Sequence, residues 1–72
     1  MENKHLIDLS LKYDLNAEEI SKLVSIVYQA GVTDMESREF KRITSYICET
    51  KILAMPPEEI IEELKLKGLI SE

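Results

Sequence analysis

The sequence predicts an all-α fold, a small bundle of about four short helices with a helix-turn-helix-like corner. Two long segments, 17–30 and 37–50, place apolar residues at helical spacing. Both glycines and both prolines fall at proposed helix boundaries, where these residues commonly begin or end helices. A chain of 72 residues is short enough for one domain, so residues 1–72 are expected to form a single helical domain.

The first helix is predicted from about Lys4 to Tyr13. Alternating apolar residues over 9–15 leave a strand as the alternative for its second half. The apolar stripe of the predicted helix comprises Leu6, Leu9 and Tyr13, and is widened by Ile7 and Leu11.

The second helix is the clearest prediction. Asn16 is a good N-cap, and Glu18 and Glu19 suit the positive end of the helix dipole. Gly31 ends the helix, since glycine adopts the left-handed conformation of a C-terminal cap. The predicted apolar stripe comprises Ile20, Leu23, Val24, Val27 and Ala30, with Ile26 and Tyr28 lying off it.

The third helix is expected to begin near Thr33 or Asp34, either of which can cap it, and to run to Thr50. The segment 52–56 reads as an apolar connector packed on the body of the protein. The buried face of this helix comprises Phe40, Ile43 and Ile47, and the side chains that fall away from it are Lys41, Arg42 and Ser45.

The fourth helix opens at Pro57, at a position where the missing N–H costs nothing, and is closed by Gly68. Its predicted buried side comprises Ile60, Ile61 and Leu64. Leu66 points the other way, and residues 69–70 add an apolar tail after the cap.

The chain is acidic, with a formal net charge of −5 at pH 7, but its charges are unevenly distributed. Residues 1–36 carry three basic and seven acidic side chains, residues 37–54 four and two, and residues 55–72 two and five. Non-specific binding to nucleic acid or anionic membranes depends on cationic charge. The acidic balance therefore disfavours both.

No segment of the sequence predicts export or membrane insertion. Asp8 interrupts the apolar run that a signal peptide would need. No run approaches the roughly 18 consecutive apolar residues of a membrane span. Cys48 is the only cysteine, which excludes a disulfide within the chain. We therefore expect a cytoplasmic protein that does not bind membranes.

The sequence contains no set of residues typical of an active site. His5 and Cys48 could be drawn as base and nucleophile, but a third orienting group and a cleft are missing, and a lone cysteine in a helical stripe is more often a small buried hydrophobe. Metal-ligand and phosphate-loop motifs are absent as well. We expect no enzymatic activity, no cofactor, no metal and no small-molecule substrate.

The stretch 9–23 resembles a helix-turn-helix unit. Asp14 stands where the motif usually has a turn glycine, and Glu19 stands where it expects a small residue. The carboxylates at the start of the second helix would face phosphates, so a helix corner within a bundle is favoured over DNA binding. The matching apolar positions are Leu9, Tyr13, Leu15, Ile20 and Leu23.

A second register leaves DNA binding open as the alternative function. Residues 30–33 would form the turn and the basic third helix would read DNA, although Phe40 comes later after the turn than a tight unit would place it. The contacts would be Arg38, Lys41, Arg42 and Ser45. A third possibility is an acidic decoy that occupies a nucleic-acid-binding protein.

The function favoured by the sequence is a non-enzymatic protein-interaction or regulatory module, either a homodimer or a partner of another protein. More apolar residues are present than four short helices can bury, and exposed apolar patches mark interaction surfaces. We expect self-association through the side of the second helix that carries Ile26 and Tyr28. The predicted interface residues are Ile26, Tyr28, Tyr46, Leu66, Leu69 and Ile70.

Overall fold

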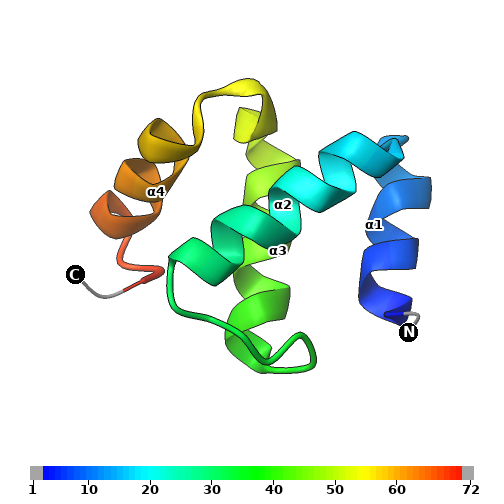
Figure 1. Ribbon diagram of the computed structural model, residues 1–72, viewed down its shortest axis with the longest axis horizontal. Helices are drawn as coiled ribbons and strands as arrows, with labels where there is room; N and C mark the ends of the chain where they lie inside the picture. Colours follow the sequence, from blue (N-terminus) through cyan, green and yellow to red (C-terminus); the bar gives the residue numbers. More distant parts are fainter. Residues whose placement is uncertain (1–2, 71–72) are drawn as a thin grey trace.

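A computed structural model describes residues 3–70, which form four α-helices and one short 3₁₀ helix (Figure 1). The elements are α1 (Lys4–Tyr13), α2 (Ala17–Gln29), α3 (Arg38–Thr50), η1 (Ile52–Ala54) and α4 (Pro57–Leu66). Residues 3–70 contain no strand. The predicted all-α bundle is confirmed, and the strand alternative for residues 9–15 is wrong.

Helix α3 lies at the centre of the fold. Both α1 and α2 pack against it, and α2 also contacts α4 and η1. In Figure 1, α2 crosses in front of α3, while α1 and α4 lie on opposite flanks. The radius of gyration is 11.1 Å, which matches the value of about 11 Å expected for a folded chain of this length. One face of α1 is consequently left at the edge of the molecule.

The corner between α1 and α2 follows from its local chemistry. Asp14 ends α1 in the left-handed conformation, with φ 56° and ψ 52°, which aspartate tolerates better than most residues. The Asn16 side chain accepts a hydrogen bond from the Glu19 N–H at 2.8 Å, and the Glu19 carboxylate accepts one from the Asn16 N–H at 2.8 Å. Glu19 therefore closes a capping box, which explains a large residue at this position.

Helix α2 ends as predicted, just before Gly31. Ala30 is the C-cap, and Gly31 has a φ of +92°, in the region that favours glycine. The Val32 N–H donates to the Val27 carbonyl at 3.1 Å, which satisfies one of the free carbonyls at the end of the helix. The chain then turns away into the connection formed by residues 30–37.

Helix α3 begins later than the predicted start at Thr33 or Asp34. The Asp34 side chain accepts a hydrogen bond from the Glu36 N–H at 3.0 Å, so Asp34 forms a turn and not a helix cap. Ser37 caps α3 instead, accepting from the Phe40 N–H at 3.1 Å. The Asn3 amide donates to the Met35 carbonyl at 3.0 Å, which ties this connection to the start of α1.

The connection from α3 to α4 packs on the body of the protein, as predicted. Lys51 ends α3 in the left-handed region with a φ of 58°, and Leu53 of η1 is buried. The Lys22 ammonium donates to the Met55 carbonyl at 2.8 Å, joining the connection to α2. Pro57 is the first residue of α4, where its missing N–H is tolerated.

The core is built from one side of each helix. The predicted face of α3 is confirmed, with Phe40, Ile43 and Ile47 fully buried. On α4, Ile60 and Leu64 are fully buried as predicted, whereas Ile61 is only partly buried. The buried hydrophobic residues are Leu6, Leu9, Leu23, Ile26, Val27, Phe40, Ile43, Ile47, Cys48, Leu53, Ile60 and Leu64.

Two predicted faces need correction. The buried stripe of α2 is rotated toward Ile26, because residues 23, 26 and 27 also have helical spacing and α2 packs against both α3 and α4. On α1, Ile7 and Leu11 are exposed and do not widen the buried stripe. No helix within residues 3–70 has the length and apolar character needed to cross a membrane.

Candidate interaction surfaces

The six predicted interface residues have different environments. Ile26 is 1% exposed, so it belongs to the core of one chain and is not left over for a partner. Tyr28 and Leu66, in contrast, are 47% and 81% exposed. The prediction that Ile26 shares an exposed surface with Tyr28 is therefore wrong, because the buried side of α2 includes Ile26.

The other three residues are partly buried against the core. The Tyr46 hydroxyl donates to the Glu63 carboxylate at 3.3 Å and so links α3 to α4. The pKa of this phenol is raised, mainly because it is partly buried and to a lesser extent because the Glu63 charge is close. The apolar tail folds back, since the Leu69 N–H donates to the Leu64 carbonyl at 2.9 Å. Leu69 and Ile70 thus pack part of their apolar surface against the core of the same chain.

Sequence reasoning missed a pair of exposed apolar side chains on α1. Ile7 is 41% exposed and Leu11, one turn further on, is 78% exposed. Each residue of an α-helix turns by about 100°, so positions 7 and 11 point well away from the buried Leu6 and Leu9. A helical projection of the sequence places Ile7 and Leu11 on a different face from Leu6 and Leu9, and this separation is the signal by which the exposed pair could be predicted.

The side chains predicted for DNA contact lie together on α3. Arg38, Lys41 and Arg42 are exposed and share one face, and Ser45 is half-buried beside them. The exposed carboxylates of Glu39 and Glu49 are on the same helix. Residues 30–37 separate α2 from α3, which is longer than the short turn of a helix-turn-helix unit. The α2–α3 pair therefore lacks the connection that this motif requires.

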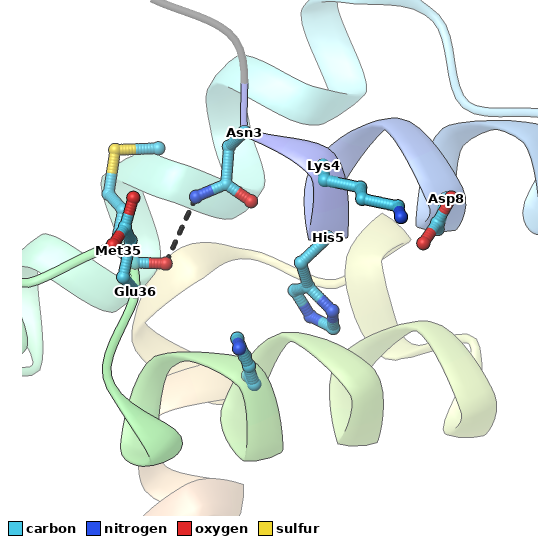
Figure 2. Close-up of a pocket in the computed structure, with 7 residues that line it drawn as sticks. Asn3, Lys4, His5, Asp8, Met35 and Glu36 are labelled. Carbon is cyan, nitrogen blue, oxygen red and sulfur yellow. Dashed lines mark hydrogen bonds between the residues drawn. The ribbon is translucent and has the colours of Figure 1, made fainter.

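A depression of about 480 Å³ lies between α1, α3 and the connection that precedes α3 (Figure 2). It is lined by Asn3, Lys4, His5, Asp8, Met35, Glu36 and Lys41. Two lysines and two carboxylates offset one another around it, and Figure 2 shows Lys4 extending along α1 toward Asp8. This depression therefore presents no excess of either charge.

His5, which lines the depression, has a lowered pKa. Its Nε2 lies 2.8 Å from the Thr44 hydroxyl, and that hydroxyl donates to the Phe40 carbonyl at 2.8 Å. Because the threonine hydrogen is used, His5 Nε2 acts as the donor. Burial and then Lys41 lower the pKa of His5, partly opposed by Asp8 and the Lys41 carbonyl. His5 therefore joins α1 to α3 in its neutral form.

His5 and Cys48 line different depressions, so they do not form a nucleophile and base pair. Cys48 is buried and borders a small cavity of about 210 Å³ together with Tyr13, Leu15 and Leu53. Burial, and then the charges of Glu19 and Glu49, raise the pKa of its thiol. A buried thiol of raised pKa is a poor nucleophile.

Comparison with protein-family models, with curated proteins and with solved structures gave no match for this chain.

Proposed function

We propose that this protein is a non-enzymatic protein-interaction module that associates with a second copy of itself. The observation that carries the proposal is the set of large apolar side chains left on the surface of a closed core. These are Ile7, Leu11, Tyr28 and Leu66. Ile7 and Leu11 lie one turn apart on α1, so they form a continuous apolar patch and are not isolated surface residues.

The size of the chain supports association. A domain near this length buries only about 60% of the surface of its unfolded chain, so its stability as a monomer is marginal. The sequence holds a single cysteine, so no disulfide within the chain contributes. Small domains without such links commonly gain stability by oligomerisation.

The test of this proposal is the average molar mass in solution as a function of protein concentration. Sedimentation equilibrium between about 10 µM and 1 mM covers the range expected for a small interface. We expect the mass to rise above the monomer value of 8.3 kDa. A constant mass of one chain throughout would reject self-association.

DNA binding remains a second candidate function, favoured by the exposed cationic face of α3. Its three cations would release counterions from phosphates, so binding would weaken steeply with salt. Titration of random duplex DNA at low salt, for the parent and for Arg42→Ala, tests this candidate. Absence of salt-dependent binding would exclude it, and equal binding by the variant would show that α3 is not the contact.

A further inference from the structure

Three exposed side chains on the outer face of α1, together with the exposed C-cap residue that follows the helix, have the 3-4-3 spacing of a helix-pairing seam. These seam residues are Lys4, Ile7, Leu11 and Asp14. Ile7 and Leu11 form the apolar middle of the seam, with a positive charge, Lys4, at one end and a negative charge, Asp14, at the other. Leu6 and Leu9 face the core instead. The two apolar seam residues are therefore not needed for the core of the single chain and are free to contact a partner.

We propose that two copies of this chain pair through their α1 seams in an antiparallel arrangement, an inference that rests on the self-association proposed above. Antiparallel pairing places Ile7 of each copy opposite Leu11 of the other. The same register places Lys4 opposite Asp14 of the partner subunit twice, because positions 4 and 14, like positions 7 and 11, lie symmetrically about the two-fold axis. In the single chain Lys4 extends toward Asp8 (Figure 2), so pairing requires its side chain to turn toward the partner subunit's Asp14. The two apolar contacts and the two charge pairs are related by a two-fold axis, as in an isologous interface.

Charge selects the antiparallel orientation. A parallel pair in register would bring Lys4 against its own copy and Asp14 against its own copy, and both contacts are between like charges. In the antiparallel pair both contacts are between opposite charges. Charges at positions flanking an apolar seam set partner orientation in helix pairs for this reason.

The position of α1 makes the seam accessible. Figure 1 shows α1 on one flank of the molecule, with α4 on the opposite flank. Two copies can approach through α1 while α4 stays distant from the contact. A ten-residue helix is about 15 Å long, so the interface is smaller than the standard one of about 800 Å² per partner. We therefore expect a weak dimer, with a Kd between about 10 µM and 1 mM.

Leu11→Glu and Leu66→Glu form a matched pair of variants. Both leucines are about four-fifths exposed, at 78% and 81%, and both lie on short helices, but only Leu11 belongs to the seam. We expect Leu11→Glu to weaken association by at least about tenfold, and Leu66→Glu to leave the Kd of the parent unchanged. Sedimentation equilibrium gives the Kd values, and circular dichroism checks that each variant remains helical.

A charge exchange tests the register and orientation. Lys4→Glu places a carboxylate opposite Asp14 of the partner subunit, so it should weaken association severalfold. Adding Asp14→Lys restores opposite charges and should return the Kd to that of the parent. Lysine is tolerated in the left-handed conformation of position 14, since Lys51 occupies the same backbone region with a φ of 58°.

The outcomes separate this inference from the proposed function. If the parent associates but Leu11→Glu does so equally well, the seam is the wrong surface, while self-association stands. If Lys4→Glu has no effect or the double variant is not restored, the antiparallel register is wrong. A parent that stays monomeric at 1 mM overturns both proposals.

Discussion

Thr44 is the one polar residue in the core formed by residues 3–70, and its hydroxyl is fully used. It donates to the Phe40 carbonyl within α3 and accepts from His5 of α1. A buried hydroxyl without a partner would destabilise the fold by about 1–3 kcal/mol. The His5–Thr44 hydrogen bond therefore explains how a threonine is tolerated at this position and why His5 must be a donor there.

The lowered pKa of His5 predicts a pH dependence of stability. The unfolded chain, with an ordinary histidine pKa of about 6.5, binds a proton more readily than the folded chain. The contribution of His5 to the free energy of unfolding should therefore be fully present above about pH 6.5. It should be lost as the pH is lowered toward 5, before the carboxylates titrate. Urea unfolding at several pH values measures this.

His5→Gln is the control for that dependence. Glutamine keeps an N–H donor for Thr44 but does not titrate. We expect a flatter profile between pH 7 and 5 than in the parent. An unchanged slope would show that His5 is not the group responsible.

Ile26 and Tyr28 provide a residue-scale test of the core. Ile26 is fully enclosed, so Ile26→Ala should lower the free energy of unfolding by about 2–5 kcal/mol. Tyr28 is half exposed two residues away, and Tyr28→Ser should cost less than about 1 kcal/mol. Urea unfolding of both variants checks the difference. Equal costs would mean that the buried side of α2 is misplaced.

At the scale of elements, the beginning of α2 is specified locally. Asn16 and Glu19 exchange hydrogen bonds with each other's N–H groups; Asn16 directly precedes α2 and Glu19 lies in its first turn. Local signals of this kind are legible in a sequence, which is why the start of α2 was predicted to the residue. The start of α3 was not, because Asp34 and Ser37 both resemble N-caps and the Asn3 contact to Met35 is long-range.

Replacing Asn16 tests the cap of α2. Asn16→Ala removes the acceptor for the Glu19 N–H and should cost about 1 kcal/mol, whereas Asn16→Gly should cost only a few tenths. The glycine variant controls for loss of the side chain, because glycine is itself an acceptable N-cap. Urea unfolding distinguishes the two, and an alanine variant as stable as the parent would contradict the assigned cap.

The faces of the helices were harder to predict than their boundaries. On α1 the apolar residues surround much of the helix, and only the packing of α1 on α3 decides that Leu9 is buried and Leu11 is exposed. On α2 the contact with α4 as well as α3 brings Ile26 inside. Sequence periodicity gives the existence of an apolar side, but the arrangement of neighbouring helices sets its width and direction.

At the scale of the whole molecule, the fold is held together by apolar packing around α3. Cys48 is part of that core, with burial raising the pKa of its thiol. We expect an alkylating reagent to modify Cys48 slowly at neutral pH and rapidly in urea, as measured by mass spectrometry. Equal rates in both conditions would mean that the thiol is accessible in the folded chain.

Thermal melts with a reducing agent and with a chelator extend this test. The sequence has one cysteine and no recognisable ligand set, so neither reagent should shift the midpoint. A lower midpoint with the chelator would reveal a metal-dependent fold and contradict a core held only by packing.

The predicted interface shows where sequence reasoning about the whole molecule ends. Tyr28 and Leu66, two of the predicted interface residues, are exposed, whereas Ile7 and Leu11, which the sequence places on the buried stripe of the first helix, are exposed as well. Self-association is a property of a surface, and the surface exists only once the helices are placed. The interface that we propose for the dimer is therefore the α1 seam and not the side of α2 that carries Tyr28.

The most direct test of this account is sedimentation equilibrium of the parent beside Leu11→Glu, from about 10 µM to 1 mM. We predict that the average mass of the parent rises from 8.3 kDa toward twice that value, while Leu11→Glu stays folded and needs a concentration at least about tenfold higher for the same rise. Equal association of the two proteins, or a parent that stays at the mass of one chain, would contradict it.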